Sequence, residues 1–160
     1  MITQELLLKY FDYKDGKLTR KIVFNNRNKL NEEVGWLKPH GYKYVSILST
    51  NQLVHRMIYL MFHNKLPKYV DHIDGNKLNN KIENLREATN AQNSWNAGIR
   101  KNNTSGVKGV YWEKKSNCWH AQCFVNYQNH FLGRYKNIEE AKKVVAEFRT
   151  KHHGEFAKHQ

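Results

Sequence analysis

The stretch from Tyr69 to Asn93 gathers the residue types that could carry chemistry in this chain. Asp71 and His72 are adjacent, and on an extended segment their side chains project to opposite sides, so each could do a separate job. Asn84 and Asn93 follow in the same stretch. Magnesium prefers oxygen ligands and is often held by one or two protein groups plus substrate phosphate, so one carboxylate and one amide oxygen would suffice. Taken alone, such residues are more often turns, and a single histidine is more often structural.

The composition favours a polyanionic partner. Lysine and arginine total 27 against 14 acidic residues, which gives the 160-residue chain a formal net charge of +13 and a pI near 9.7. Nucleic acid is the favoured partner, because no stretch forms the long basic amphipathic helix that a membrane surface would bind. The first residues form no secretory leader and no segment is long enough to span a bilayer, so we expect an intracellular protein that is not secreted.

The two cysteines, Cys118 and Cys123, exclude a disulfide framework and a four-cysteine zinc site. The motif "CWHAQC" resembles a metal site only superficially. On a strand, Cys118 and His120 point one way while Cys123 points the other. We therefore expect both thiols to pack in the interior and the chain to hold no structural zinc.

The first half of the chain changes its periodicity near residue 53. Residues 1–51 are short and strand-like, with Asp15 and Gly16 placed as a hairpin turn and a second strand unit in "GWLKPHGYKYVSIL". The segment "LVHRMIYLMFHNKLP" then predicts a helix closed by Pro67. Its core face would carry Val54, Ile58, Met61 and Phe62.

The second half divides at a polar segment. "YVDHIDGN" and "KIENLREAT" predict two short strands around a turn at Gly75 and Asn76, and "NAQNSWNAG" predicts the start of a helix. Residues 97–103 are the best linker. After them we predict three strands, with turns at 116–117 and 128–129, and one helix from a cap at Asn137 to Gly154. We expect Trp119, Val125 and Leu132 to face that helix.

The combined spacing of "HRMIYLMFHNKLP…VDHIDGNKLNNKIENLREATNAQN" resembles the HNH endonuclease family, of the phage and intron-encoded type with a ββα-metal site. The resemblance spans residues 53–96. It implies that Asp71 and Asn93 bind one divalent ion, Mg²⁺ with Mn²⁺ as a substitute. It also implies that His72 is the general base and that Asn84 braces the loop that orients it. Arg56 matches the family's "HR" pair and has a structural or phosphate-contacting role.

The remainder, "SGVKGVYWEKKSNCWHAQCFVNYQNHFLGRYKNIEEAKKVVAEFRTKHHGEFA", resembles the plant apetala-two, or ethylene-response-factor, DNA-binding domain. The resemblance implies that a sheet lies in the major groove of DNA. Lys114 and Lys115, in the first turn, suit a phosphate contact or a solvated turn. The strand positions depart from the arginine- and tryptophan-rich plant pattern, so no base preference transfers. The outward positions expected to contact DNA are Lys108, Tyr111, Glu113, Gln122, Phe124, Asn129, Phe131 and Arg134.

We therefore predict an α+β protein. An HNH module, preceded by short strands and a helix, would occupy residues 1–96, with its core motif at 53–96. A linker at 97–103 would lead to a three-stranded antiparallel sheet packed on one helix at 104–160. The expected function is metal-dependent cleavage of double-stranded DNA by a phage-encoded homing endonuclease, acting as a monomer or weak dimer in the host cytoplasm or nucleoid. A non-catalytic DNA-binding regulator and a non-specific or restriction-type nuclease are the alternatives, and nicking and double-strand cleavage both stay open.

Overall fold

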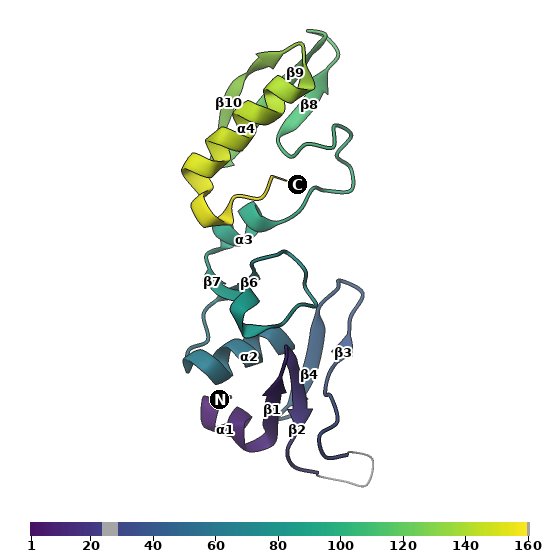
Figure 1. Ribbon diagram of the computed structural model, residues 1–160, viewed down its shortest axis with the longest axis vertical. Coiled ribbons are helices and arrows are strands. Elements are labelled where there is room, and N and C mark those ends of the chain that lie inside the picture. Colours follow the sequence, from purple (N-terminus) through teal and green to yellow (C-terminus); the bar gives the residue numbers. More distant parts are fainter. Residues whose placement is uncertain (24–28, 160) are drawn as a thin grey trace. The chain divides into compact units, whose positions relative to one another are not determined.

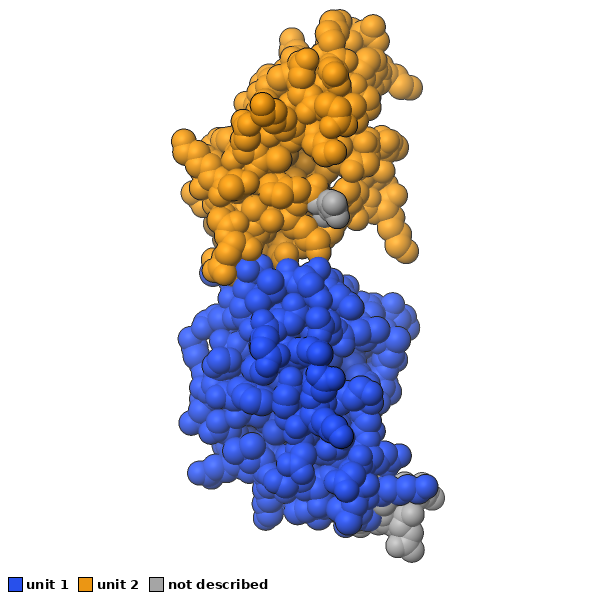
Figure 2. All heavy atoms as spheres, in the orientation of Figure 1, with its two compact units in different colours: residues 1–89 blue, residues 90–160 orange. Residues whose placement is uncertain are grey.

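The computed structural model describes residues 1–23 and 29–159. The chain forms two compact units, residues 1–89 and 90–160, which are coloured separately in Figure 2. In the described parts of the chain, no helix is both long and apolar enough to cross a membrane.

The described part of the first unit, residues 1–23 and 29–89, contains three small antiparallel sheets and two helices (Figure 1). The helices are α1 (Gln4–Tyr10) and α2 (Val54–His63), and a 3₁₀ turn η1 covers Ile82–Asn84. The sheets pair β1 with β2, β3 with β4 and β5, and β6 with β7. Their strands are β1 (Phe11–Lys14), β2 (Lys17–Arg20), β3 (Trp36–Leu37), β4 (Lys43–Ile47), β5 (Thr50–Leu53), β6 (Tyr69–His72) and β7 (Leu85–Ala88).

The hairpin predicted at Asp15 and Gly16 is confirmed. Lys14 pairs with Lys17, and both turn residues have positive φ, 51° and 83°, as a two-residue hairpin loop requires. The prediction that the first 51 residues are strand-like is wrong for α1. That helix starts where the Thr3 side chain accepts a hydrogen bond from the Leu6 backbone N–H, a cap that outweighs the short length of the apolar run.

The helix α2 is confirmed, but it ends earlier than predicted. Asn64 adopts the left-handed conformation at its C-terminus, so the helix stops at His63 before Pro67 is reached. Phe62, predicted on the core face, is 48% exposed and packs edge-on against the Tyr13 ring. At 3.6 residues per turn, Phe62 lies at the edge of the helix face that Val54, Ile58 and Met61 form.

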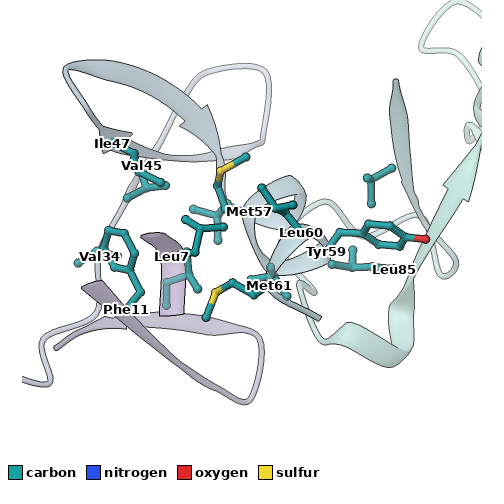
Figure 3. Close-up of a cluster of buried hydrophobic side chains, with 14 residues drawn as sticks. Leu7, Phe11, Val34, Val45, Ile47, Met57, Tyr59, Leu60, Met61 and Leu85 are labelled. Atoms are coloured by element: carbon teal, nitrogen blue, oxygen red, sulfur yellow. The ribbon is translucent and has the colours of Figure 1, made fainter. Parts of the chain in front are cut away.

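The core of the first unit forms around α2 (Figure 3). Leu7 of α1, Leu18 of β2 and Met57 of α2 are each 0% exposed. Burying an aliphatic side chain of this size contributes roughly 1.5–3 kcal/mol, so these contacts fix α1 and the first hairpin against α2. The remaining core residues include Phe11, Val34, Val45, Ile47, Val54, Ile58, Leu60, Met61, Val70 and Leu85.

The second unit has the predicted three-stranded antiparallel sheet packed on one helix, so the α+β fold class is confirmed. A short helix, α3 (Asn90–Asn96), precedes β8 (Val110–Glu113), β9 (Cys118–Val125) and β10 (Gln128–Tyr135), which pair in the order β10-β9-β8. The helix α4 (Ile138–His153) covers one face of the sheet (Figure 1), and η2 (Gly154–Phe156) follows it.

The ends of α4 follow the prediction, and one turn does not. Asn137 accepts a hydrogen bond from the Glu139 backbone, and Gly154 terminates the helix with positive φ. The turn predicted at 128–129 lies instead at Asn126 and Tyr127, whose φ values are 49° and 64°. Gln128 already pairs with Val125, because Tyr127, despite its strand propensity, adopts the left-handed turn conformation.

The strand residues predicted to lie in the core of this unit are found in its interior. Trp119 and Leu132 pack with Val110, Ala121, Ala141 and Val145, and Val125 is buried. Both cysteines are buried and free, as expected of packing residues. Trp112 of β8 is 40% exposed.

Candidate functional site

Strand β6 places Asp71 and His72 on opposite sides of a two-stranded ribbon. Asp71 lies opposite Arg86 of β7, and the Arg86 Nε is 3.0 Å from the Asp71 Oδ2. His72 lies opposite Leu85 and faces α2. Both side chains are buried, with Asp71 5% and His72 4% exposed, so alternation on the strand gives each a separate environment as predicted.

Other side chains surround the imidazole of His72. Its Nε2 lies 2.9 Å from the Oδ1 of Asn80, which is itself buried. The His55 ring of α2 is 4.8 Å away between centroids, and the Tyr42 ring is 6.2 Å away. Burial lowers the pKa of His72, against the hydrogen bond to Asn80, and the ammonium of Lys77 lowers it further. A neutral imidazole is the form that can accept a proton.

Asn84 ties the two ends of the loop between β6 and β7 together. Its Oδ1 accepts a hydrogen bond from the Asp74 backbone N–H at 3.0 Å. Its Nδ2 donates to the Asp74 Oδ1 at 3.0 Å and to the Asn79 carbonyl at 2.8 Å. The backbone N–H of Ile73, next to His72, donates to the Asn84 carbonyl. These bonds are what a loop brace requires.

Asp74 shapes this loop through its carboxylate. It accepts from the backbone N–H of Asn76 and from the side chain of Asn79. Burial alone would raise the pKa of Asp74, but hydrogen bonds from Asn79, Asn76 and Asn84 outweigh it and lower the pKa. The loop asparagines therefore serve largely as hydrogen-bond partners of one ionised carboxylate.

The β1–β2 hairpin supports the same loop from outside. The Tyr13 hydroxyl accepts from the Ile82 backbone N–H, and Lys81 forms an ion pair with Asp15 at 2.9 Å. A Cβ at Gly16 would lie 2.9 Å from the Lys81 backbone nitrogen, and the positive φ of Gly16 also excludes most side chains. The first hairpin thus helps to fix the loop that carries Asn80.

The "HR" pair at the start of α2 is structural in this arrangement. His55 is buried, and burial, followed by the charges of His72 and Arg56, lowers its pKa to about 3, so it is neutral at physiological pH. Arg56 donates from Nη1 to the Lys68 carbonyl at 2.6 Å and thereby holds the chain that leads into β6. A DNA contact by Arg56 stays a prediction.

The residues of the site fit a hard divalent cation held by few protein groups. Among the described residues, no group of three or more histidine, cysteine or acidic side chains could form a complete protein cage. Asp71 is a buried carboxylate beside His72, and one carboxylate plus amide oxygen, water and phosphate is a usual magnesium ligand set. Asn93 lies on α3, which belongs to the second unit, and its role as a ligand stays a prediction.

The outer face of the second unit's sheet carries most of the residues predicted to contact DNA. Strand register places Tyr111 beside His120, Gln122 beside Phe131 and Phe124 beside Asn129. Three aromatic rings of this face, those of Tyr111, Phe124 and Phe131, are exposed by 39%, 56% and 56%. The Arg134 guanidinium lies 5.9 Å from the Phe131 ring, and Asn129 donates to Gln122. This face exposes aromatic rings and one arginine, which are groups that stack on bases and contact phosphates in nucleic-acid-binding proteins.

Lys108 differs from the other predicted contacts, because its ammonium points to α3. It donates to the carbonyls of Trp95 at 2.8 Å and Ala97 at 2.6 Å, and lies 3.4 Å from that of Ser94. Burial, followed by the charge of Arg149, lowers the pKa of Lys108 to about 8. The residue therefore caps the C-terminus of α3. In the neighbouring turn, Lys114 is exposed, and the Lys115 backbone donates to Glu113.

Sequence reasoning missed the contribution of the β3–β4 turn to this site. His40 and Tyr42 come from that turn, and Lys77 comes from the loop after His72. The Lys77 ammonium donates to the His40 carbonyl and lies over the Tyr42 ring. The "HGY" motif gave no local signal for this contact, because residues 35 positions apart in the chain meet only after folding.

Comparisons with known proteins place this segment in a family. A family profile described as HNH endonuclease matches residues 52–95. Protein 3.8 of Escherichia phage T7 is 39% identical over 95 residues, which cover 58% of this chain and 78% of that protein. An uncharacterized HNH endonuclease of Acanthamoeba polyphaga mimivirus is 38% identical over 125 residues, 76% of this chain and 64% of the relative.

A third relative is named as a candidate HNH homing endonuclease of the SPbeta prophage in Bacillus subtilis. It is 39% identical over 69 residues, covering 39% of this chain and 40% of its own length. No solved structure matches the chain. The profile covers β6, β7 and the loop that holds His72, and the phage T7 relative is matched over most of its length. The chain belongs to the HNH endonuclease family.

Proposed function

We propose that this nuclease is a metal-dependent DNA endonuclease that hydrolyses phosphodiester bonds in duplex DNA. The observation that carries the proposal is the placement of Asp71 and a neutral, hydrogen-bonded His72 on one strand, next to a loop braced by Asn84. Asp71 and Asn93 supply oxygen ligands to one divalent ion, Mg²⁺ or Mn²⁺. When bound, such an ion stabilises negative charge on the scissile phosphate and the leaving oxygen.

His72 acts as the general base of this reaction. Its ring takes the proton of the attacking water, and burial supports this role by lowering the pKa of the imidazole. Asn84 contributes by holding the loop rather than by contacting the reacting atoms, since its three hydrogen bonds are made within the loop. A positioned base of this kind supplies roughly 10²- to 10⁴-fold in rate.

The second unit serves as the DNA reader. The resemblance to the apetala-two domain and the exposed face with Phe124, Phe131 and Arg134 support docking of the sheet on duplex DNA. The net charge of +13 favours the same partner. In this division of labour, residues 1–96 carry the cutting site and residues 104–160 bind. The helix α3 (Asn90–Asn96) of the nuclease motif belongs to the second compact unit.

The biological role that fits best is that of a phage-encoded homing endonuclease, which cuts at a long and loosely specified site. Relatives in Escherichia phage T7 and in a Bacillus subtilis prophage support this role. A single copy holds one His72 and would nick one strand, whereas a double-strand break needs a dimer or two successive events.

The proposal is tested on supercoiled plasmid incubated with the full chain in Mg²⁺, Mn²⁺ or EDTA. We expect conversion to nicked or linear DNA only with a divalent ion, and no conversion in any metal would refute the enzyme. Sequencing the ends produced from a random-sequence library then tests the homing role. Clustering at one preferred site supports that role, and uniform cutting would identify a non-specific nuclease instead.

A further inference from the structure

On one surface of the nuclease unit, two lysine ammonium groups each lie over a tyrosine ring. Lys77, in the loop after His72, holds its ammonium 4.6 Å from the Tyr42 ring centroid and donates to the His40 carbonyl at 3.1 Å. Lys38, at the β3–β4 turn, holds its ammonium 4.3 Å from the Tyr44 ring centroid. Cation–π contacts of this kind orient an ammonium without neutralising its charge. We call this group, Lys38, His40, Tyr42, Tyr44 and Lys77, the lysine–tyrosine surface.

The parts of this surface hold one another in place. His40 connects the two tyrosines, with its Nε2 3.1 Å from the Tyr44 hydroxyl and its ring tilted against Tyr42. The Lys77 side chain also lies along Gly41, where a Cβ would sit 3.5 Å from the Lys77 Cδ. Ordering of a long lysine side chain is a main cost of binding through it, so a lysine that is already held binds at a lower entropic cost.

The surface borders the candidate catalytic base directly. The Tyr42 ring lies 5.3 Å from that of His55 and 6.2 Å from that of His72. Burial raises the pKa of the Tyr42 hydroxyl, and the charge of Asp71 raises it further. A strand that presents its scissile phosphate to His72 would therefore pass next to Lys77.

Among the described residues, no carboxylate forms an ion pair with Lys38 or Lys77, unlike other lysines nearby. In the described part of the first unit, Lys81 pairs with Asp15 at 2.9 Å and Lys65 pairs with Glu87 at 2.6 Å. The ion pairs found among those residues include neither Lys38 nor Lys77. Binding an anion at Lys38 or Lys77 therefore breaks no ion pair between residues that the structure describes.

We propose that the lysine–tyrosine surface binds backbone phosphates of the DNA duplex beside the scissile phosphate, with Lys77 as the contact nearest His72. The nuclease unit then has its own phosphate-binding site, separate from the sheet of the second unit. The inference rests on the proposed function for the identity of the ligand as DNA. The lysine–tyrosine surface would position the DNA backbone at His72, and its phosphate contacts would not distinguish base sequences.

The test compares charge-neutral variants at free and paired lysines in the full chain. Affinity for a fluorescein-labelled DNA duplex is measured against salt concentration in EDTA, where no cleavage occurs. Each phosphate contact contributes about 0.9 to the slope of log K against log salt. We expect K77Q to lower the slope by about 0.9 and the K38Q/K77Q double variant to lower it by about 1.8. The matched controls K81Q and K65Q remove the same charge from ion-paired lysines and should change the slope much less.

The outcomes separate this inference from the proposed function. Equal slopes for K77Q, K81Q and the unmodified chain would overturn the phosphate site, even if the unmodified chain nicks plasmid. A selective loss of slope in K77Q would establish the site even if the unmodified chain fails to nick DNA in Mg²⁺ or Mn²⁺, in which case only the nuclease proposal fails. Thermal unfolding of each variant is measured in parallel. Because Lys77 is exposed and Lys38 half-buried, we expect only a small loss of stability, which shows that a reduced salt slope comes from lost phosphate contacts and not from unfolding.

Discussion

The Nε2 of His72 lies 2.9 Å from the Oδ1 of Asn80, and both side chains are buried. An amide oxygen accepts and does not donate, so with the amide in this orientation the His72 Nε2 carries the hydrogen. The basic lone pair then falls on Nδ1. One hydrogen bond thus sets both the orientation of the imidazole and its tautomer, which a general base requires.

Replacing Asn80 with Ala should therefore lower the cleavage rate with little change in DNA affinity. A single neutral hydrogen bond is worth about 1 kcal/mol, so we expect about a fivefold lower rate under saturating DNA. The measurement is the single-turnover nicking rate with Mg²⁺. The matched control is Asn79→Ala, which removes a neighbouring amide that contacts Asp74 instead of His72. Equal rates for the two variants would argue against the positioning role of Asn80.

Substitutions at Asn84 and at Asp71 should have different effects, the first on stability and the second on metal binding. Asn84→Ala removes three hydrogen bonds of the loop and should lower the free energy of unfolding by about 1–3 kcal/mol. It should leave Mn²⁺ affinity unchanged, because its side chain is engaged within the loop. Asp71→Asn should weaken Mn²⁺ binding strongly, since it removes the charged ligand. Calorimetric titration with Mn²⁺ and urea unfolding check both results, and a loss of Mn²⁺ affinity in Asn84→Ala would contradict the brace.

The buried His55 predicts how stability depends on pH. In the unfolded chain this residue binds a proton below about pH 6.5, whereas burial holds its folded pKa at about 3. The unfolded state therefore binds more protons in that window, and stability falls as the pH drops, by at most roughly 1.4 kcal/mol per pH unit for this group. His55→Asn should show a shallower fall between about pH 7.5 and about pH 5 in urea unfolding. The exposed His63→Asn is the control and should keep the parent's slope.

Substitutions of Lys108 and Lys114 in the second unit should have opposite effects: the first should lower stability, and the second should weaken the salt dependence of DNA binding. Lys108→Met keeps the apolar stem but removes the ammonium from the carbonyls at the end of α3, so stability should fall by about 1.5–3 kcal/mol. The salt dependence of DNA binding should change little. Lys114→Met, at an exposed turn, should instead lower the salt slope by about 0.9 if it contacts a phosphate, at unchanged stability. A stable Lys108→Met with a reduced salt slope would restore Lys108 to the DNA surface.

The sequence predicted the elements whose signals are local. The hairpin at Asp15 and Gly16, the strand with Asp71 and His72, and the helix capped by Asn137 each depend on neighbouring residues, and each is found. The helix α1 was missed because its cap, Thr3, precedes only two turns of a short apolar run. The turn at Asn126 and Tyr127 was misplaced by two residues, because tyrosine is a strand former in isolation.

The sequence could not predict those contacts of the site that join distant segments of the chain. Lys77 reaches the Tyr42 ring and the His40 carbonyl, and Lys108 reaches α3, only through the tertiary fold. Lysine side chains ordinarily lie in solvent. Their neighbours in the sequence therefore do not show whether the ammonium caps a helix, lies over an aromatic ring or stays free in solvent. The neighbours of Asn80 in the sequence likewise do not show that its side chain meets His72.

The central claim is that His72 is the base of a metal-dependent DNA cleavage reaction. The most direct measurement is the initial nicking rate of supercoiled plasmid in Mg²⁺ by the unmodified chain, by His72→Ala and by the control His63→Ala. The account predicts that the unmodified chain and His63→Ala nick at similar rates, while His72→Ala is slower by roughly 10²- to 10⁴-fold. Cleavage by His72→Ala at the rate of the unmodified chain would contradict it.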